Sequence, residues 1–98
     1  PSEVQEIIIS HPDVFDVAII GLRHEKWGEQ VTAVVVPREN AKVNEKKIID
    51  YCKEKMAGYK RPKKVIFIRD EDMPRTATGK ILHRVLRERY SKEVKSHV

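Results

Sequence analysis

Cysteine is almost absent from this chain, because Cys52 is the only one among 98 residues. This scarcity excludes an internal disulfide and any zinc site built from several thiolates. The 4 histidines do not show the spacing of metal ligands, so we predict no metal site. The neighbours of Cys52 place it on the apolar face of a helix, where we expect a buried structural thiol. A chain without disulfides fits the reducing cytoplasm, the location that we predict.

Long apolar runs and aromatic side chains are scarce too. No run approaches the roughly 20 apolar residues of a membrane-spanning helix, so we expect no transmembrane segment. Aromatic residues make up 6% of the chain and are scattered, so they offer no platform for stacking nucleic-acid bases. Charge is abundant instead: 36% of the residues are charged, and the net charge is +5. Residues 60–64 and 75–89 hold much of the positive excess, a pattern typical of a solvated surface or of a site for polyanions or phosphorylated ligands.

The spacing of apolar residues predicts three helices and three strands in the order α-β-β-α-β-α. This order favours an α+β fold of two layers, with the helices packed against one face of a short three-stranded sheet. No linker or repeat divides the chain, so residues 1–98 form one predicted domain. The predicted helices run from Ser2 to the His11-Pro12 pair, from an Asn44 cap to Gly58 and from Ile81 to Tyr90, and the predicted strands cover Val14–Leu22, Gln30–Pro37 and Lys64–Arg69.

One segment, Pro74–Leu82, places a lysine directly after a glycine at the predicted start of the third helix. The unpaired N–H groups and the dipole of a helix start attract anions and disfavour a lysine. A phosphate or carboxylate held by Gly79, Lys80 and the helix start would explain the lysine. A Walker A loop is excluded, since Pro74 and Ile81 stand where that motif needs glycine and Ser or Thr. The nine residues alone are equally compatible with an ordinary basic loop.

Four landmarks, in this order along the chain, resemble the C-terminal small domain of the adenylate-forming (AMP-binding, ANL superfamily) enzymes. The run Pro-Arg-Thr-x-Thr-Gly-Lys-Ile, continuing into a helix rich in Arg and Leu, is typical of the acyl-CoA synthetase branch. His24 and His83 depart from the common pattern, which has aspartate and arginine at these positions. The resemblance covers about residues 1–90, and its landmarks are Pro1–Glu6, Lys26–Glu29 with the following valine-rich strand, Gly58–Lys63 and Pro74–Leu82.

The resemblance implies a part in an AMP-forming acyl-CoA synthetase (carboxylic acid–CoA ligase). In that reaction a carboxylate attacks the α-phosphate of ATP to give an acyl adenylate, and the thiol of CoA then displaces AMP. By resemblance, Lys80 is the catalytic residue and offsets the repulsion between carboxylate and phosphate. The neighbours implied to face ATP and the adenylate are Arg75, Thr78 and Gly79. The residues implied to meet CoA, after a rotation of the domain, are Trp27, Lys60, Arg61 and Lys63.

The resemblance also implies what the domain works with. ATP, Mg²⁺ and CoA are expected, with ATP and Mg²⁺ bound mainly by a large N-terminal domain that lies, with the hinge, outside this sequence. We therefore expect residues 1–98 to be a mobile lid domain that is inactive alone. A lysine-acetylating enzyme acting on Lys80 is a further expected partner, and nucleic acid is not expected. Two alternatives stay open: the adenylation domain of another adenylate-forming enzyme, and a non-catalytic basic binding module.

Overall fold

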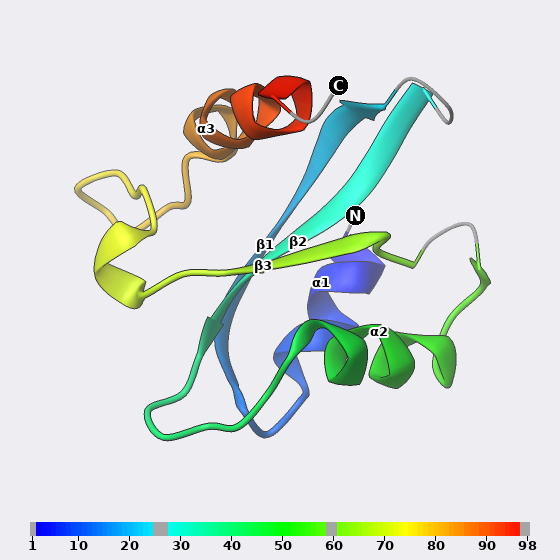
Figure 1. Ribbon diagram of the computed structural model, residues 1–98. Coiled ribbons are helices and arrows are strands. Elements are labelled where there is room, and N and C mark those ends of the chain that lie inside the picture. The colour runs from blue at the N-terminus through cyan, green and yellow to red at the C-terminus, as the bar shows by residue number, and fades with distance from the viewer. Residues whose placement is uncertain (1, 25–27, 59–60, 97–98) are drawn as a thin grey trace.

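Figure 1 shows the computed structural model of the chain, which describes residues 2–24, 28–58 and 61–96. Within these residues the elements follow the predicted order, and a short 3₁₀ turn, η2 (Asp70–Asp72), follows the last strand. The α+β class and the order α-β-β-α-β-α are therefore confirmed. The bounds are α1 Ser2–Ile9, β1 Val14–His24, β2 Gly28–Pro37, α2 Glu45–Lys53, β3 Lys64–Phe67 and α3 His83–Ser96.

The sheet has the strand order β1-β2-β3, with β2 in the centre. β1 and β2 pair antiparallel, whereas β2 and β3 pair parallel. The hairpin strands each extend two residues further than predicted, because His24 pairs with Gly28. Gly28 has a φ of 76°, in the left-handed region that glycine enters without strain.

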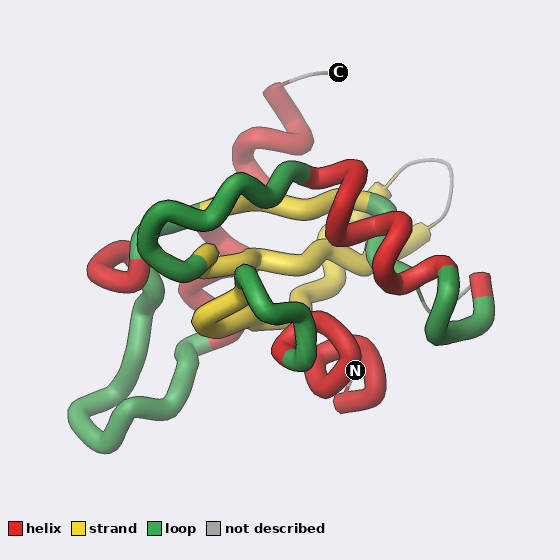
Figure 2. The backbone as a smooth tube through the Cα atoms, turned by 90° about the horizontal axis from the view of Figure 1, so that it is seen from below, coloured by secondary structure: helices red, strands yellow, loops and turns green. Residues whose placement is uncertain are grey.

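Helices cover both faces of the sheet, which corrects the predicted packing on one face in two layers. α1 and α2 lie on the face that carries Val17 and Val35, and α3 lies on the face that carries Val34. Figures 1 and 2 show α3 on the opposite side of the sheet from the other two helices. The reason is the run Ala33–Val36 in β2, in which every residue is buried. A continuous apolar run in a central strand needs cover on both faces, and such a run is typical of a strand between two layers.

The helix ends differ from the prediction in ways that affect the site. Asn44 is the N-cap of α2 as predicted, and its Oδ1 accepts the N–H of Lys47 at 2.9 Å. α2 ends at Lys53, before Gly58, and α3 begins at His83 rather than at residue 81. No helix in the described residues is long and apolar enough to cross a membrane.

Cys52 lies on α2 with none of its surface exposed, so the predicted buried thiol is confirmed. Burial raises the pKa of this thiol, and the positive charge of Arg61 opposes the rise. The thiol is therefore kept neutral and out of contact with solvent.

Candidate functional site

Lys80 lies in a closed loop between η2 and α3, which we call the lysine loop (Pro74–Leu82). The main chain closes this loop at its base. Arg75 and Ile81 form an antiparallel bridge, and the N–H of Leu82 donates to the carbonyl of Pro74 at 2.8 Å. Figures 1 and 2 show the loop projecting from one end of the domain. The lysine is therefore displayed away from the core on a loop of defined shape.

Hydrogen bonds to Thr76 hold the tip of the lysine loop. Its N–H donates to the carbonyl of Lys80 at 2.8 Å, and its carbonyl accepts the N–H of Gly79 at 2.9 Å. Its Oγ1 accepts the N–H of Lys80 at 3.1 Å and lies 3.0 Å from Oγ1 of Thr78. Gly79 turns the chain with a φ of 93°, which is the left-handed region that favours glycine. The loop thus fixes the backbone of Lys80 on both sides.

The sequence predicted an anion held by the helix start and by the backbone of Gly79 and Lys80, and this part of the prediction is wrong. α3 begins at His83, three residues after Lys80, so the lysine does not stand at the helix start. The N–H groups of Gly79 and Lys80 are both donated within the loop and do not point to a ligand. The side chain of Lys80 is what the loop offers: the residue is exposed, and its ammonium makes no hydrogen bond or ion pair within the described part of the chain.

Arg75 lies at the base of the lysine loop, where two carboxylates hold its side chain. Its Nη2 lies 2.7 Å from Oδ2 of Asp16 on β1 and 2.7 Å from Oδ1 of Asp70 in η2. Its Nη1 also donates to the carbonyl of Asp70 at 3.3 Å. The hydrogen bond to Asp16, followed by the one to Asp70, raises the pKa of Arg75 above its ordinary value. We call these three side chains the Arg75 clamp, and all the described contacts of the guanidinium anchor the loop.

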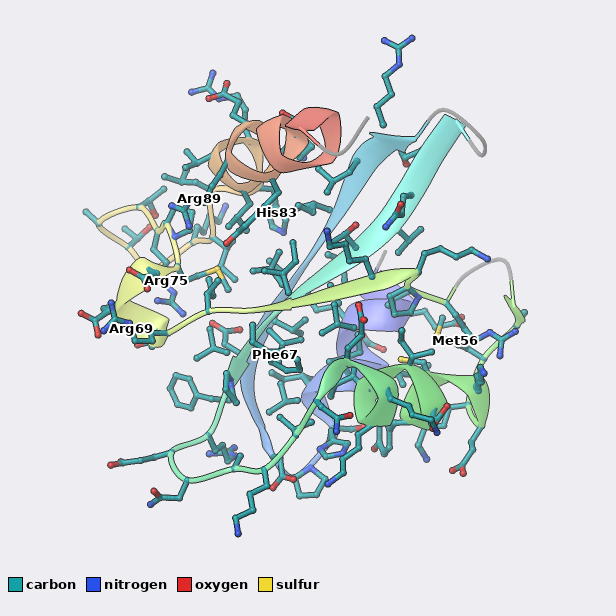
Figure 3. The ribbon with its side chains drawn as sticks, in the orientation of Figure 1. Met56, Phe67, Arg69, Arg75, His83 and Arg89 are labelled. Carbon is teal, nitrogen blue, oxygen red and sulfur yellow. The ribbon has the colours of Figure 1, made fainter. Side chains whose placement is uncertain are left out.

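Two further contacts fasten the segment beside the lysine loop. Met73 is 5% exposed, and it packs with Ile81 in the apolar cluster beneath α3. Nη1 of Arg89, on α3, donates to the carbonyl of Asp72 at 3.0 Å. Figure 3 shows Arg75 and Arg89 near the same turn, one from the loop and one from the helix. Both ends of the lysine loop are thus tied to the body of the domain.

Sequence reasoning missed Asp16, Asp70 and Arg89. Asp16 precedes Arg75 by 59 residues, so no local pattern links the two. One signal was present: Asp16 is a lone charged residue within the apolar strand between Val14 and Ile20. A charge in such a strand usually has a partner, because leaving it unpaired on a packed element is costly.

The four residues implied to meet CoA are only partly described, because Trp27 and Lys60 lie outside the described residues. Arg61 and Lys63 border a hollow of about 190 Å³ between α2 and the start of β3. The hollow is completed by Ile49, Lys53, Gly58 and Pro62. The N–H of Lys63 donates to the carbonyl of Val31 at 2.8 Å, which holds this segment beside β2.

The structure does not bring Arg61 and Lys63 together with Lys80. The basic hollow lies just before β3 in the chain, and the lysine loop follows after its far end, beyond η2. Figure 1 shows these two regions at opposite ends of β3. The chain therefore carries two separate candidate sites rather than one.

The chain belongs to the family of AMP-binding enzyme C-terminal domains, which matches residues 3–80. It is 52% identical over 94 residues to a long-chain-fatty-acid–CoA ligase of Mycobacterium tuberculosis, covering 96% of this chain and 18% of that protein. Among solved structures it matches ATP-bound MatB from Rhodopseudomonas palustris with a TM-score of 0.89 and 38% identity, over 96% of this chain and 18% of the other. It also matches the anthranilate CoA ligase AuaEII in complex with anthranoyl-AMP, with a TM-score of 0.85 and 34% identity, over 97% and 19%.

These findings confirm the resemblance to the small domain of adenylate-forming enzymes. The chain spans less than a fifth of the length of each of these relatives.

Proposed function

We propose that residues 1–98 are the C-terminal mobile domain of a longer AMP-forming acyl-CoA synthetase. Membership of the family supports this, as does the fact that three relatives, each several times longer, carry such a domain. The relative at 52% identity is by name a long-chain-fatty-acid–CoA ligase, which favours a fatty acid as the carboxylate. A large N-terminal domain is proposed to bind most of the ATP and Mg²⁺, in a reducing cytoplasm.

Lys80 is the proposed catalytic residue for adenylate formation. A carboxylate oxygen bonds to the α-phosphorus of ATP while the bond from that phosphorus to pyrophosphate breaks, so two anions must meet. An ammonium placed between them stabilises the charge of the transition state. The single observation that carries this role is the exposed Lys80 side chain, whose ammonium has no partner among the described residues. It stands on a loop in which hydrogen bonds to Thr76 hold both the N–H and the carbonyl of Lys80. A lysine suits the task, because it is a compact point charge on a long stem.

Thr78 and Gly79 support this role through the shape of the loop. Gly79 supplies the turn with positive φ directly before Lys80, and Oγ1 of Thr78 contacts the hydroxyl of Thr76. Thr78 is exposed two residues before Lys80, and we propose that its hydroxyl faces the nucleotide. Arg75, at the base of the loop, holds the loop that carries Lys80 through its bridge to Ile81.

The thioester half of the reaction is assigned to the other end of β3. Lys53, Arg61 and Lys63 border one hollow, and cationic side chains in such a group fit the phosphates of CoA. Trp27 and Lys60 remain predictions for the same site. The hollow and the lysine loop lie at opposite ends of β3, so a different end of the domain is proposed to serve each half-reaction. This separation supports a rotation between the two half-reactions.

Replacement of Lys80 by alanine, in the enzyme that carries this domain, tests the proposal. We expect carboxylate-dependent exchange between ATP and pyrophosphate to fall by about 10²–10³-fold, which is typical for the loss of one group that stabilises charge in the transition state. Thioester formation from preformed acyl adenylate and CoA should stay within about threefold, because the lysine has left the centre in that half. Acetylation of Lys80 stays a prediction with the same expected effect, since it also removes the charge.

Lys42→Ala is the matched control, since Lys42 is an exposed lysine in the segment before α2 that belongs neither to the lining of the hollow nor to the lysine loop. It should leave both half-reactions unchanged. Retention of normal exchange by Lys80→Ala, or an equal loss in both halves, would contradict the proposed role.

A further inference from the structure

We propose that Asp16 and Asp70 act through Arg75 as positioning residues that set where Lys80 points. The inference rests on the proposed function of Lys80, and it adds to that function two carboxylates outside the lysine loop. β1 supplies Asp16, η2 supplies Asp70, and the Arg75 clamp joins both to the base of the loop.

The path from the clamp to the lysine is short and continuous. Arg75 forms the backbone bridge to Ile81, the residue directly after Lys80. Thr76, the residue directly after Arg75 in the chain, makes the hydrogen bonds to the N–H and the carbonyl of Lys80. A displacement of Arg75 therefore moves both sides of the loop at the point where Lys80 leaves it.

The strength of the clamp comes from geometry and partial burial. The side chains of Arg75 and Asp16 are only 24% and 29% exposed, so water screens their attraction less than in an open surface pair. Nη2 of Arg75 contacts both carboxylates at 2.7 Å while Nη1 donates to the carbonyl of Asp70, and a lysine ammonium, which has one nitrogen, would not reproduce this set of contacts. Because the carboxylates balance Arg75, Lys80 is left as the cation that the tip of the loop presents.

The test measures the two half-reactions separately in the enzyme that carries this domain, with Arg75→Gln and Asp16→Asn. We expect each variant to lower kcat of ATP–pyrophosphate exchange by about 10- to 100-fold, since displacement of a catalytic group by about 1 Å is sufficient for such a loss. KM for ATP should stay within about twofold, and so should thioester formation from preformed acyl adenylate. A general loss of folding would lower both halves together.

Two further variants distinguish a positioning role of the clamp from a general effect of lost charge or of lost stability. Arg69→Gln removes the same charge from an arginine that pairs with Glu71 and Asp72 beside the clamp, and none of the described contacts of Arg69 reaches the lysine loop. It should keep normal exchange. Asp16→Glu retains a carboxylate, and it should recover exchange to within about threefold of the unaltered enzyme.

The proposal is overturned if Arg75→Gln and Asp16→Asn exchange as Arg69→Gln does, or if both half-reactions fall in parallel. It is supported if only exchange falls and Asp16→Glu restores it. Lys80→Ala distinguishes the two levels of inference. Normal ATP–pyrophosphate exchange in Lys80→Ala would refute the proposed function of Lys80 itself. A loss of exchange in Lys80→Ala together with normal exchange in Arg75→Gln would refute only the positioning role of the clamp.

Discussion

Gly79 is the residue at which backbone conformation and function meet. Its φ is 93°, yet a methyl group added to its Cα would find no atom within 4 Å, so only the backbone disfavours a side chain. We expect Gly79→Ala to cost about 1–2 kcal/mol in the loop conformation and to lower ATP–pyrophosphate exchange. Gly28→Ala is the matched control, because Gly28 shares the positive φ and the open surroundings. The midpoint of urea unfolding should fall in both variants, whereas ATP–pyrophosphate exchange should fall only in Gly79→Ala. The same rate of exchange in the two variants would contradict this prediction.

Single residues also mark the limit of what the sequence predicted at the site. Lys80 could be singled out because its glycine, its neighbours and its order among the landmarks are all local in the chain. The partners of Arg75 could not, because Asp16 is 59 residues away and only the fold brings it near. From the sequence, Arg75 was predicted only to face ATP and the adenylate, and the two carboxylates that hold it could not be predicted.

At the scale of elements, α3 is both the cover of one sheet face and the continuation of the lysine loop. Leu86 is fully buried against β1 and β2 in this layer, together with Tyr90. We expect Leu86→Ala to lower the free energy of unfolding by about 2–5 kcal/mol, through lost burial and the cavity left behind. Leu82 is 38% exposed, and Leu82→Ala should cost clearly less. Chemical denaturation of both variants measures the difference, and similar losses would contradict the assignment of α3 to the core.

The elements themselves were largely predictable, because their apolar spacing is regular and their caps are local. What the spacing did not show is on which side of the sheet each helix lies. The buried run Ala33–Val36 carried that information, since alternating residues of β2 serve opposite layers. The start of α3 at His83 was missed because the loop closes on itself through Arg75 and Ile81 before the helix begins.

For the whole molecule, Cys52 serves as a reporter of unfolding. Its thiol is fully buried and burial raises its pKa, so a thiol reagent should react only with molecules that have opened. The neutral thiol is the favoured form in the fold. The stability linked to it is therefore present below the ordinary thiol pKa and is lost as the pH rises through the raised value. Labelling at neutral pH should follow the urea unfolding curve, with the fully unfolded chain as the control. Immediate labelling in native buffer would contradict the buried position.

The Arg75 clamp means that the lysine motif is not self-contained. A peptide of residues 74–82, or the same nine residues transplanted into another protein, would have the sequence of the motif but would lack the Asp16 carboxylate from β1. Such a graft would contain the lysine, but the orientation of its side chain would not be fixed. Anyone who rebuilds this chemistry on a new scaffold must transfer an aspartate from a distant strand along with the loop.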